Sequence, residues 1–72
     1  MERDDARAVA TRAADYTKLR RGAAAERMLR AALTSEPGNG VLLIELARAL
    51  HAQKRHDEAL SAAESGTTSG AA

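Results

Sequence analysis

The 72-residue sequence contains no cysteine, tryptophan or phenylalanine, and only one tyrosine and one proline. The lack of cysteine excludes a disulfide framework and a thiolate metal site. With so few aromatic rings, any core has to be built from leucine, isoleucine, valine, methionine and many alanines. Alanine has the highest helix propensity, and β-branched residues are few, so the composition predicts an all-α chain.

The sequence also lacks the long apolar run, of roughly 18 residues, that a membrane-spanning helix requires. Its formal net charge is only +1, which gives no strong field to attract nucleic acid or anionic lipid. The first ten residues carry charges of both signs and no apolar run, unlike a secretory signal peptide. We therefore expect a single cytoplasmic domain with no nucleic-acid or membrane partner.

Apolar and small residues recur at helical spacing in four segments. The first helix is expected from about residue 6, with Asp4 or Asp5 as its cap and a stripe that ends at Leu19. Gly22 is expected to stop this helix in a left-handed conformation. The second helix is expected over residues 23–34.

The stretch SEPGNG, residues 35–40, is the clearest break in the chain. Asn39 is expected to cap a third helix over residues 40–53, which is apolar on more than one face and so should lie between neighbours. The fourth helix is expected from about residue 56 or 57 to Ser65, with a thin stripe that includes Ala59 and Leu60.

The two halves of the chain align when the sequence is shifted by 34 residues. Helices then fall on helices, and the turn Arg20-Arg21-Gly22 falls on Lys54-Arg55-His56. The apolar and small positions that match are Val9 with Leu43, Ala13 with Ala47, Tyr16 with Leu50, Ala25 with Ala59, and Leu29 with Ala63.

With these residues the chain resembles the tetratricopeptide repeat (TPR) family, whose pattern is W-x2-L-G-x2-Y, then A-x3-F, then P. The second copy reads Leu43-x2-Leu46-Ala47-x2-Leu50 and Ala59-x3-Ala63, and the first reads Val9-x2-Arg12-Ala13-x2-Tyr16, Ala25-x3-Leu29 and Pro37. The resemblance covers about residues 6–66. Departures are Arg12 in place of leucine, Ala63 in place of an aromatic residue, and the missing second proline.

The resemblance implies four antiparallel helices that form two stacked TPR-like αα-hairpins, a fragment of an α-solenoid. The expected domain is 1–66, with units at about 6–39 and 40–66, followed by a flexible tail over 67–72. Small residues are expected where the helices of a unit cross, so that the backbones approach closely. The residues expected to pack the repeats are Ala13, Tyr16, Ala25, Leu29, Leu43, Leu46, Ala47, Leu50 and Ala59.

No arrangement of residues indicates catalysis. His51 and His56 lack the i, i+4 spacing of a helical metal pair, the serines lie in no nucleophile elbow, and no phosphate loop is present. We therefore expect neither enzyme activity nor a cofactor or metal.

By resemblance, the leading helix of each unit lines a concave face. The corresponding positions are Arg7, Ala10, Ala14, Thr17 and Lys18 in the first unit, and Val41, Ile44, Arg48, His51 and Ala52 in the second. Of these, Arg7, Lys18, Val41, Ile44, Arg48 and His51 are the expected partner-binding residues. An apolar floor with a cationic rim favours an amphipathic or acidic peptide of a partner protein. Alternatively, Val41 and Ile44 are buried against the first unit.

Two other functions are compatible with the sequence. The chain could be a structural piece, either a homodimer or the start of a longer repeat array, because helical arrays usually contain three or more units. A small helical DNA-binding domain built on the turn near residues 53–56 is the third hypothesis.

Overall fold

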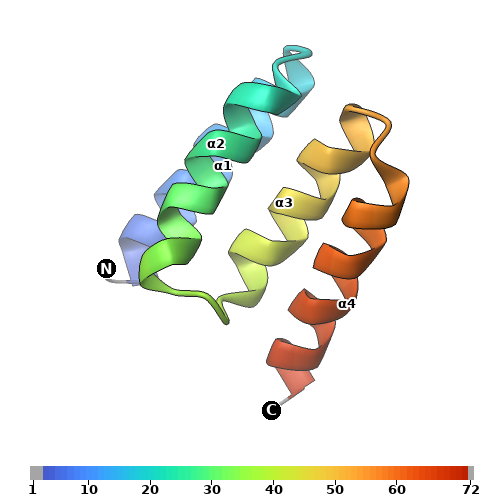
Figure 1. The fold of residues 1–72 in the computed structure, drawn as a ribbon. Helices are drawn as coiled ribbons and strands as arrows, with labels where there is room; N and C mark the ends of the chain where they lie inside the picture. Colours follow the sequence, from blue (N-terminus) through green and yellow to red (C-terminus); the bar gives the residue numbers. More distant parts are fainter. Residues whose placement is uncertain (1–2, 72) are drawn as a thin grey trace.

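The computed structural model describes residues 3–71, and their side chains over 5–67. Over this range the chain is helical apart from short turns. The helices are α1 (Arg3–Lys18), α2 (Gly22–Ser35), α3 (Gly40–Ala52) and α4 (His56–Ala71). Successive helices run antiparallel, so α1 and α2 form one αα-hairpin and α3 and α4 form another (Figure 1). The predicted all-α fold of two hairpins is confirmed.

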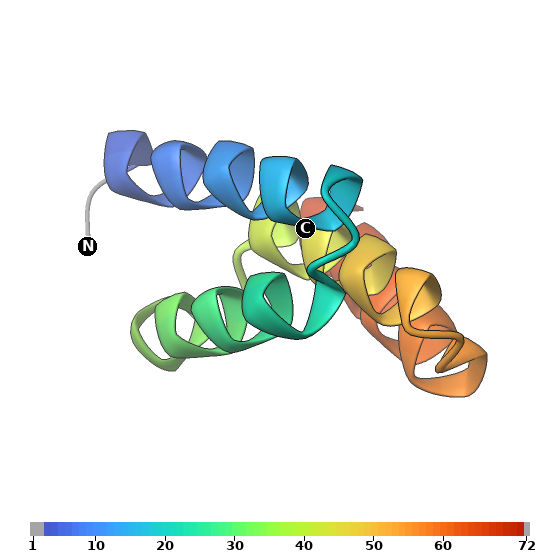
Figure 2. The same ribbon diagram turned by 90° about the horizontal axis from the view of Figure 1, so that it is seen from above.

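The two hairpins stack through α3. This helix packs against α1, α2 and α4, whereas α4 packs against α3 alone in the described part of the chain. Seen from above, α3 lies between the first hairpin and α4 (Figure 2). The sequence predicted such a position for this helix from its apolar character on more than one face.

Among the described residues, the buried hydrophobic side chains are all alanine or leucine. Leu29, Leu42 and Leu50 are its largest fully buried members. Ala13 and Ala25, expected where α1 and α2 cross, both have no exposed surface, while Ala47 is only partly buried. Alanines at these positions let the helix backbones approach closely, so a core without aromatic rings can still be densely packed.

The turns within the two hairpins are built alike, and here the expectation for Gly22 was wrong. No glycine in the described residues has a positive φ. Instead, Arg20 and Lys54 both take the left-handed conformation, each with φ 63°. They are equivalent residues under the 34-residue shift, since 54 minus 20 is 34.

Backbone hydrogen bonds close both turns in the same way. The N–H of Arg21 donates to the carbonyl of Tyr16 at 2.8 Å, and the N–H of Arg55 donates to the carbonyl of Leu50 at 3.0 Å. A bond back over five residues, with a left-handed residue before the donor, is the Schellman motif that ends many helices. The repeat is therefore preserved in the backbone geometry of the turns.

Gly22 has a packing role instead. It is a buried residue at the start of α2. A Cβ atom at this position would lie 3.1 Å from the carbonyl oxygen of Ala49 and 3.1 Å from Cγ of Gln53. The glycine thus allows the start of α2 to approach the end of α3 closely.

Several helix details also differ from the expectation. Helix α1 begins at Arg3, so neither Asp4 nor Asp5 precedes it as a cap. Leu19 and Leu60 were placed on apolar stripes, but both are exposed, whereas Ala59 and Ala62 are the alanines of α4 that are buried in the core. Asn39 does cap α3, because its side-chain oxygen accepts the N–H of Leu42 at 3.1 Å.

Helix α4 continues to Ala71, beyond the expected end at Ser65. The extension packs on α3 through Gly66, where a Cβ atom would lie 3.1 Å from Cδ1 of Ile44 and 3.2 Å from Cβ of Leu43. A larger residue would separate the two helices. The division into a domain over 1–66 and a tail over 67–72 stays a prediction.

Candidate interaction surface

A groove opens at the end of the molecule where α1 and α3 begin and α4 approaches its C-terminus. It has a volume of about 770 Å³. Ala6 and Arg7 of α1, Val41, Ile44 and Glu45 of α3, and Gly66 and Thr67 of α4 line it, with the turn before α3. We call it the N-terminal groove. One wall of the groove therefore comes from α1 of the first hairpin, and the other two come from α3 and α4 of the second hairpin.

The apolar part of the N-terminal groove comes from Val41 and Ile44. The Asn39 cap fixes the start of α3, and the spacing of three residues then places both side chains on one side of the helix. Val41 is 51 % exposed, whereas Ile44 is half-buried and lies close to Gly66 of α4. Two alternatives for this pair were compatible with the sequence, an exposed apolar floor and burial against the first unit. Neither alternative fits both residues, since Val41 is exposed and Ile44 is partly packed.

The polar part of the groove carries both signs of charge. Arg7 is exposed at the wall formed by α1. On α3, Oε1 of Glu45 lies 3.9 Å from Nη1 of Arg48, a distance that makes the pair weak. Oε2 of Glu45 is buried without a hydrogen-bond partner. The groove can therefore orient a partner through charge as well as bury its apolar surface.

Three of the six expected partner-binding residues are brought together here: Arg7, Val41 and Ile44. Arg48 lies beside the groove through its pair with Glu45. Lys18 is exposed in the last turn of α1, at the opposite end of the molecule.

His51 also lies at that opposite end, in the last turn of α3. Its Nδ1 atom is 3.1 Å from Nδ1 of His56, and the two rings meet edge to face with centroids 4.8 Å apart. This pairing across the turn was not expected from their spacing in the sequence. No group of three or more histidine or acidic side chains that could hold a metal ion occurs among the described residues.

The remaining inner-face positions of α1 offer little side chain to a partner. Ala10 is buried and Ala14 is partly buried. Thr17 uses its hydroxyl within the helix, donating a hydrogen bond to the carbonyl of Ala13 at 3.1 Å. The larger exposed side chains on this face of α1 therefore lie near the two ends of the helix.

A charge network that the sequence analysis missed joins the two hairpins. The carboxylate of Glu26 on α2 accepts hydrogen bonds from Nε of Arg30 at 2.7 Å and Nη1 of Arg55 at 2.6 Å. Gln53 adds a third bond at 3.0 Å, and Arg55 also donates to Glu58 of α4 at 2.6 Å. We call these residues the Glu26 network.

The network changes the titration of its central carboxylate. The hydrogen bond from Arg30, opposed by burial and aided by the bonds from Gln53 and Arg55, lowers the pKa of Glu26 from 4.5 to about 2. The pairs within one segment, Glu26 with Arg30 and Arg55 with Glu58, have the spacing of helical ion pairs and could be found in the sequence. The contact between Glu26 and Arg55, which joins the two hairpins, could not be found in this way, because the two residues lie far apart in the sequence.

A comparison with known protein families decides the assignment. The family model described as tetratricopeptide repeat matches residues 16–69, more than half of the chain. The chain belongs to the tetratricopeptide repeat family. No curated protein and no solved structure gave a match.

The TPR assignment agrees with the packing of the four helices as two repeat units. TPR units generally mediate protein–protein interactions, and they are typically non-catalytic. No helix of this TPR chain within residues 3–71 is both long enough and apolar enough to cross a membrane.

Proposed function

We propose that this TPR chain is a non-catalytic module that binds a peptide or helix of a partner protein in the N-terminal groove. The observation that carries the proposal is Val41, an apolar side chain that is half exposed in a concave site of about 770 Å³. A concave, partly apolar surface with a few polar groups is the usual form of a binding site. A cytoplasmic location stays a prediction.

Burial of apolar surface supplies the affinity in this proposal. A fully buried valine or isoleucine side chain contributes about 1.5–3 kcal/mol relative to an exposed one. Val41 is about half exposed, so its further burial by a partner contributes about 1 kcal/mol or somewhat more. The charges of Arg7 and Arg48 at the exposed rim would act mainly on orientation and association rate.

The proposal can be tested with a random linear-peptide phage library selected against the immobilised chain. We expect enriched peptides that share an apolar residue. Val41→Asp should weaken the binding of a selected peptide about tenfold, because a buried charge replaces an apolar contact. Fluorescence anisotropy with the labelled peptide measures this change. Val41 is a better test site than Ile44, since Ile44 also lies close to α4.

Leu60→Asp is the matched control. Leu60 is 61 % exposed, also apolar, and lies on α4 outside the groove. It should leave peptide binding unchanged, and both variants should keep the helical circular dichroism of the parent. No enrichment of peptides, or equal losses for Val41→Asp and Leu60→Asp, would contradict a binding site in the N-terminal groove.

The exposed Leu60 also favours a second candidate function, a structural role in self-assembly or in a longer array. Among the described helices, α4 packs against α3 alone, so the side of α4 that carries Leu60 is open to a further helix. Sedimentation velocity at two protein concentrations tests self-assembly. A sedimentation coefficient that rises with concentration would support it, and a constant monomer value would remove it.

A further inference from the structure

A second hollow lies at the opposite end of α1 and α3, between the two hairpin turns. Its volume is about 520 Å³. Thr17 of α1, Gly22 of α2, and Ala52 and Gln53 at the end of α3 contribute small or polar surface. Arg20 and Lys54 line it from the two turns. We call it the hinge hollow.

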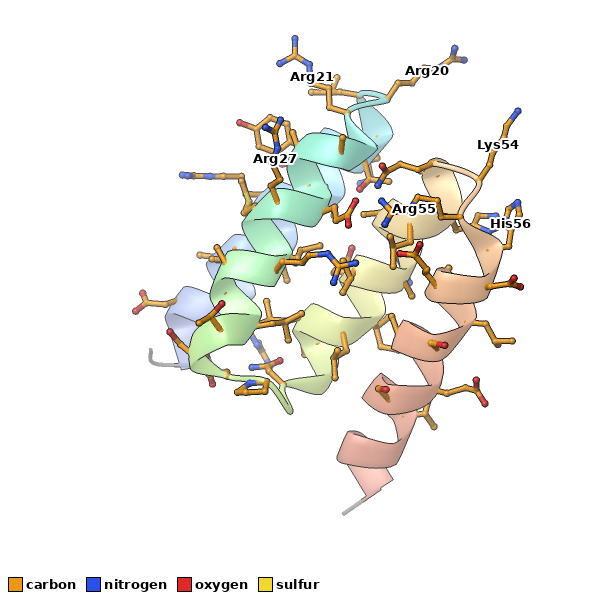
Figure 3. All side chains as sticks on the ribbon, in the orientation of Figure 1. Arg20, Arg21, Arg27, Lys54, Arg55 and His56 are labelled. Carbon is orange, nitrogen blue, oxygen red and sulfur yellow. The ribbon has the colours of Figure 1, made fainter. Side chains whose placement is uncertain are left out.

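Two unpaired cations face the hinge hollow. Arg20 and Lys54 are both exposed, and neither forms an ion pair with another described residue. Figure 3 shows their side chains projecting from the two turns at the same end of the molecule, while Arg21 and Arg27 point to the other side. The shared left-handed backbone at residues 20 and 54 gives the two side chains equivalent positions in the repeat.

The hinge hollow and the N-terminal groove lie along the same pair of helices. Val41 lines the groove and Ala52 lines the hollow, and both belong to α3. Position 52 lies eleven residues after position 41, which corresponds to a length of about 16 Å at about 1.5 Å per helical residue. An extended peptide, at about 3.3 Å per residue, covers this length in about five residues.

The positive charge of the hinge hollow favours an anionic ligand. The small number of cations that line it favours a peptide over a nucleic acid. Binding of a nucleic acid usually requires several phosphate contacts, whereas this hollow offers Arg20 and Lys54 in a chain whose net charge is only +1. Stacking of bases on aromatic side chains is also lacking, since the single aromatic residue, Tyr16, is packed against the core. One or two carboxylates match the two cations.

We propose that the hinge hollow binds acidic residues of a peptide segment whose apolar residue occupies the N-terminal groove about five positions away. This inference rests on the proposed function of the groove. The peptide lies extended along α1 and α3. The apolar contact supplies affinity, and Arg20 and Lys54 fix the direction in which the peptide runs.

The test uses peptides from the same phage library. We expect the enriched sequences to carry aspartate or glutamate about four to six residues from the apolar residue. The double variant Arg20→Glu, Lys54→Glu should weaken a selected peptide at least about tenfold. When the same library is selected for binding to the immobilised double variant, the enriched peptides should carry lysine or arginine at the positions that were acidic. Added salt should weaken the parent complex, because these contacts are exposed.

The matched control is the double variant Arg21→Glu, Arg27→Glu, which makes the same change in net charge on the side away from the hollow. It should retain at least about a third of the parent affinity, since the remaining effect is long-range and screened. Circular dichroism checks that both double variants remain helical.

The possible failures are distinguishable. Peptides that share an apolar residue, depend on Val41 and show no acidic preference would overturn this inference and leave the groove proposal standing. Equal losses for the two double variants would overturn it as well. An oligothymidylate that binds more tightly than the selected peptides, and that depends on Arg20 and Lys54, would assign the hollow to phosphate instead. An absence of any enriched peptide would refute both proposals.

Discussion

The Glu26 network makes a strong prediction about stability. Its central carboxylate has a side chain only 13 % exposed and accepts hydrogen bonds from three side chains. Replacing Glu26 by glutamine keeps the shape of the side chain but removes its charge. The neutral amide then faces the donors of Arg30 and Arg55, and these two positive charges lose the attraction of the carboxylate. We expect Glu26→Gln to weaken the association of the two hairpins.

The size of the effect follows from the titration of this group. At about 1.36 kcal/mol per pKa unit, a fall in the pKa of Glu26 from 4.5 to about 2 sets a ceiling of about 3 kcal/mol. The partners are more open to solvent, since the side chains of Arg30 and Arg55 are 52 % and 39 % exposed. Screening by water and salt reduces the value, and we expect a loss of about 1–2 kcal/mol near pH 7. For a chain of this size, the melting temperature falls by about 5–15 °C.

The sign of the pH dependence is fixed by the direction of the pKa change. Because the pKa is lower in the folded chain, the stabilisation is fully present above 4.5 and is lost as the pH falls toward 2. Urea denaturation of the parent and Glu26→Gln should therefore give free energies of unfolding that differ near neutral pH and converge in acid. Asp15→Asn makes the same charge change at an exposed residue and should have little effect. A stability difference that persists unchanged at low pH would refute an ionic origin.

Two further predictions concern the backbone. Gly22→Ala should destabilise the chain by about 1–2 kcal/mol, because its Cβ would lie 3.1 Å from the carbonyl oxygen of Ala49. Gly38→Ala, at an exposed position without a positive φ, should leave the urea midpoint unchanged or slightly higher. Lys54→Gly should raise the melting temperature, with a gain of about 0.5–1 kcal/mol, because a glycine adopts the φ of 63° without strain. A lower melting temperature for Lys54→Gly would contradict that account of the turn.

The features that the sequence predicted are those with local or periodic signals. The alanine-rich composition and the helical spacing predicted an all-α fold, and the 34-residue alignment predicted two equivalent hairpins. The Asn39 cap was predictable because asparagine before an apolar helical segment has one main local role. The resemblance to the TPR family implied that Arg7, Val41 and Ile44 share one face, and the structure brings these three residues to a common groove.

The features that were missed depend on contacts between segments. Gly22 was interpreted through backbone freedom, the most common role of a glycine after a helix, but the approach of α3 determines its position. The extension of α4 past Ser65 likewise depends on Gly66 fitting against Ile44 and Leu43, since serine, threonine and glycine have little intrinsic helix preference. Neither contact leaves a trace in the neighbouring sequence.

The repeat equivalence also explains why Leu60 is exposed. A shift of 34 residues places Leu60 in the second unit at the position of Glu26 in the first. In the first unit this position faces the turn of the next hairpin, where Glu26 contacts Gln53 and Arg55. In the second unit the described residues supply no hairpin to face it, so the leucine is left 61 % exposed. A further helix or a second copy packed on α4 would therefore meet an apolar contact where the first interface has an ionic one, and the two interfaces would respond oppositely to added salt.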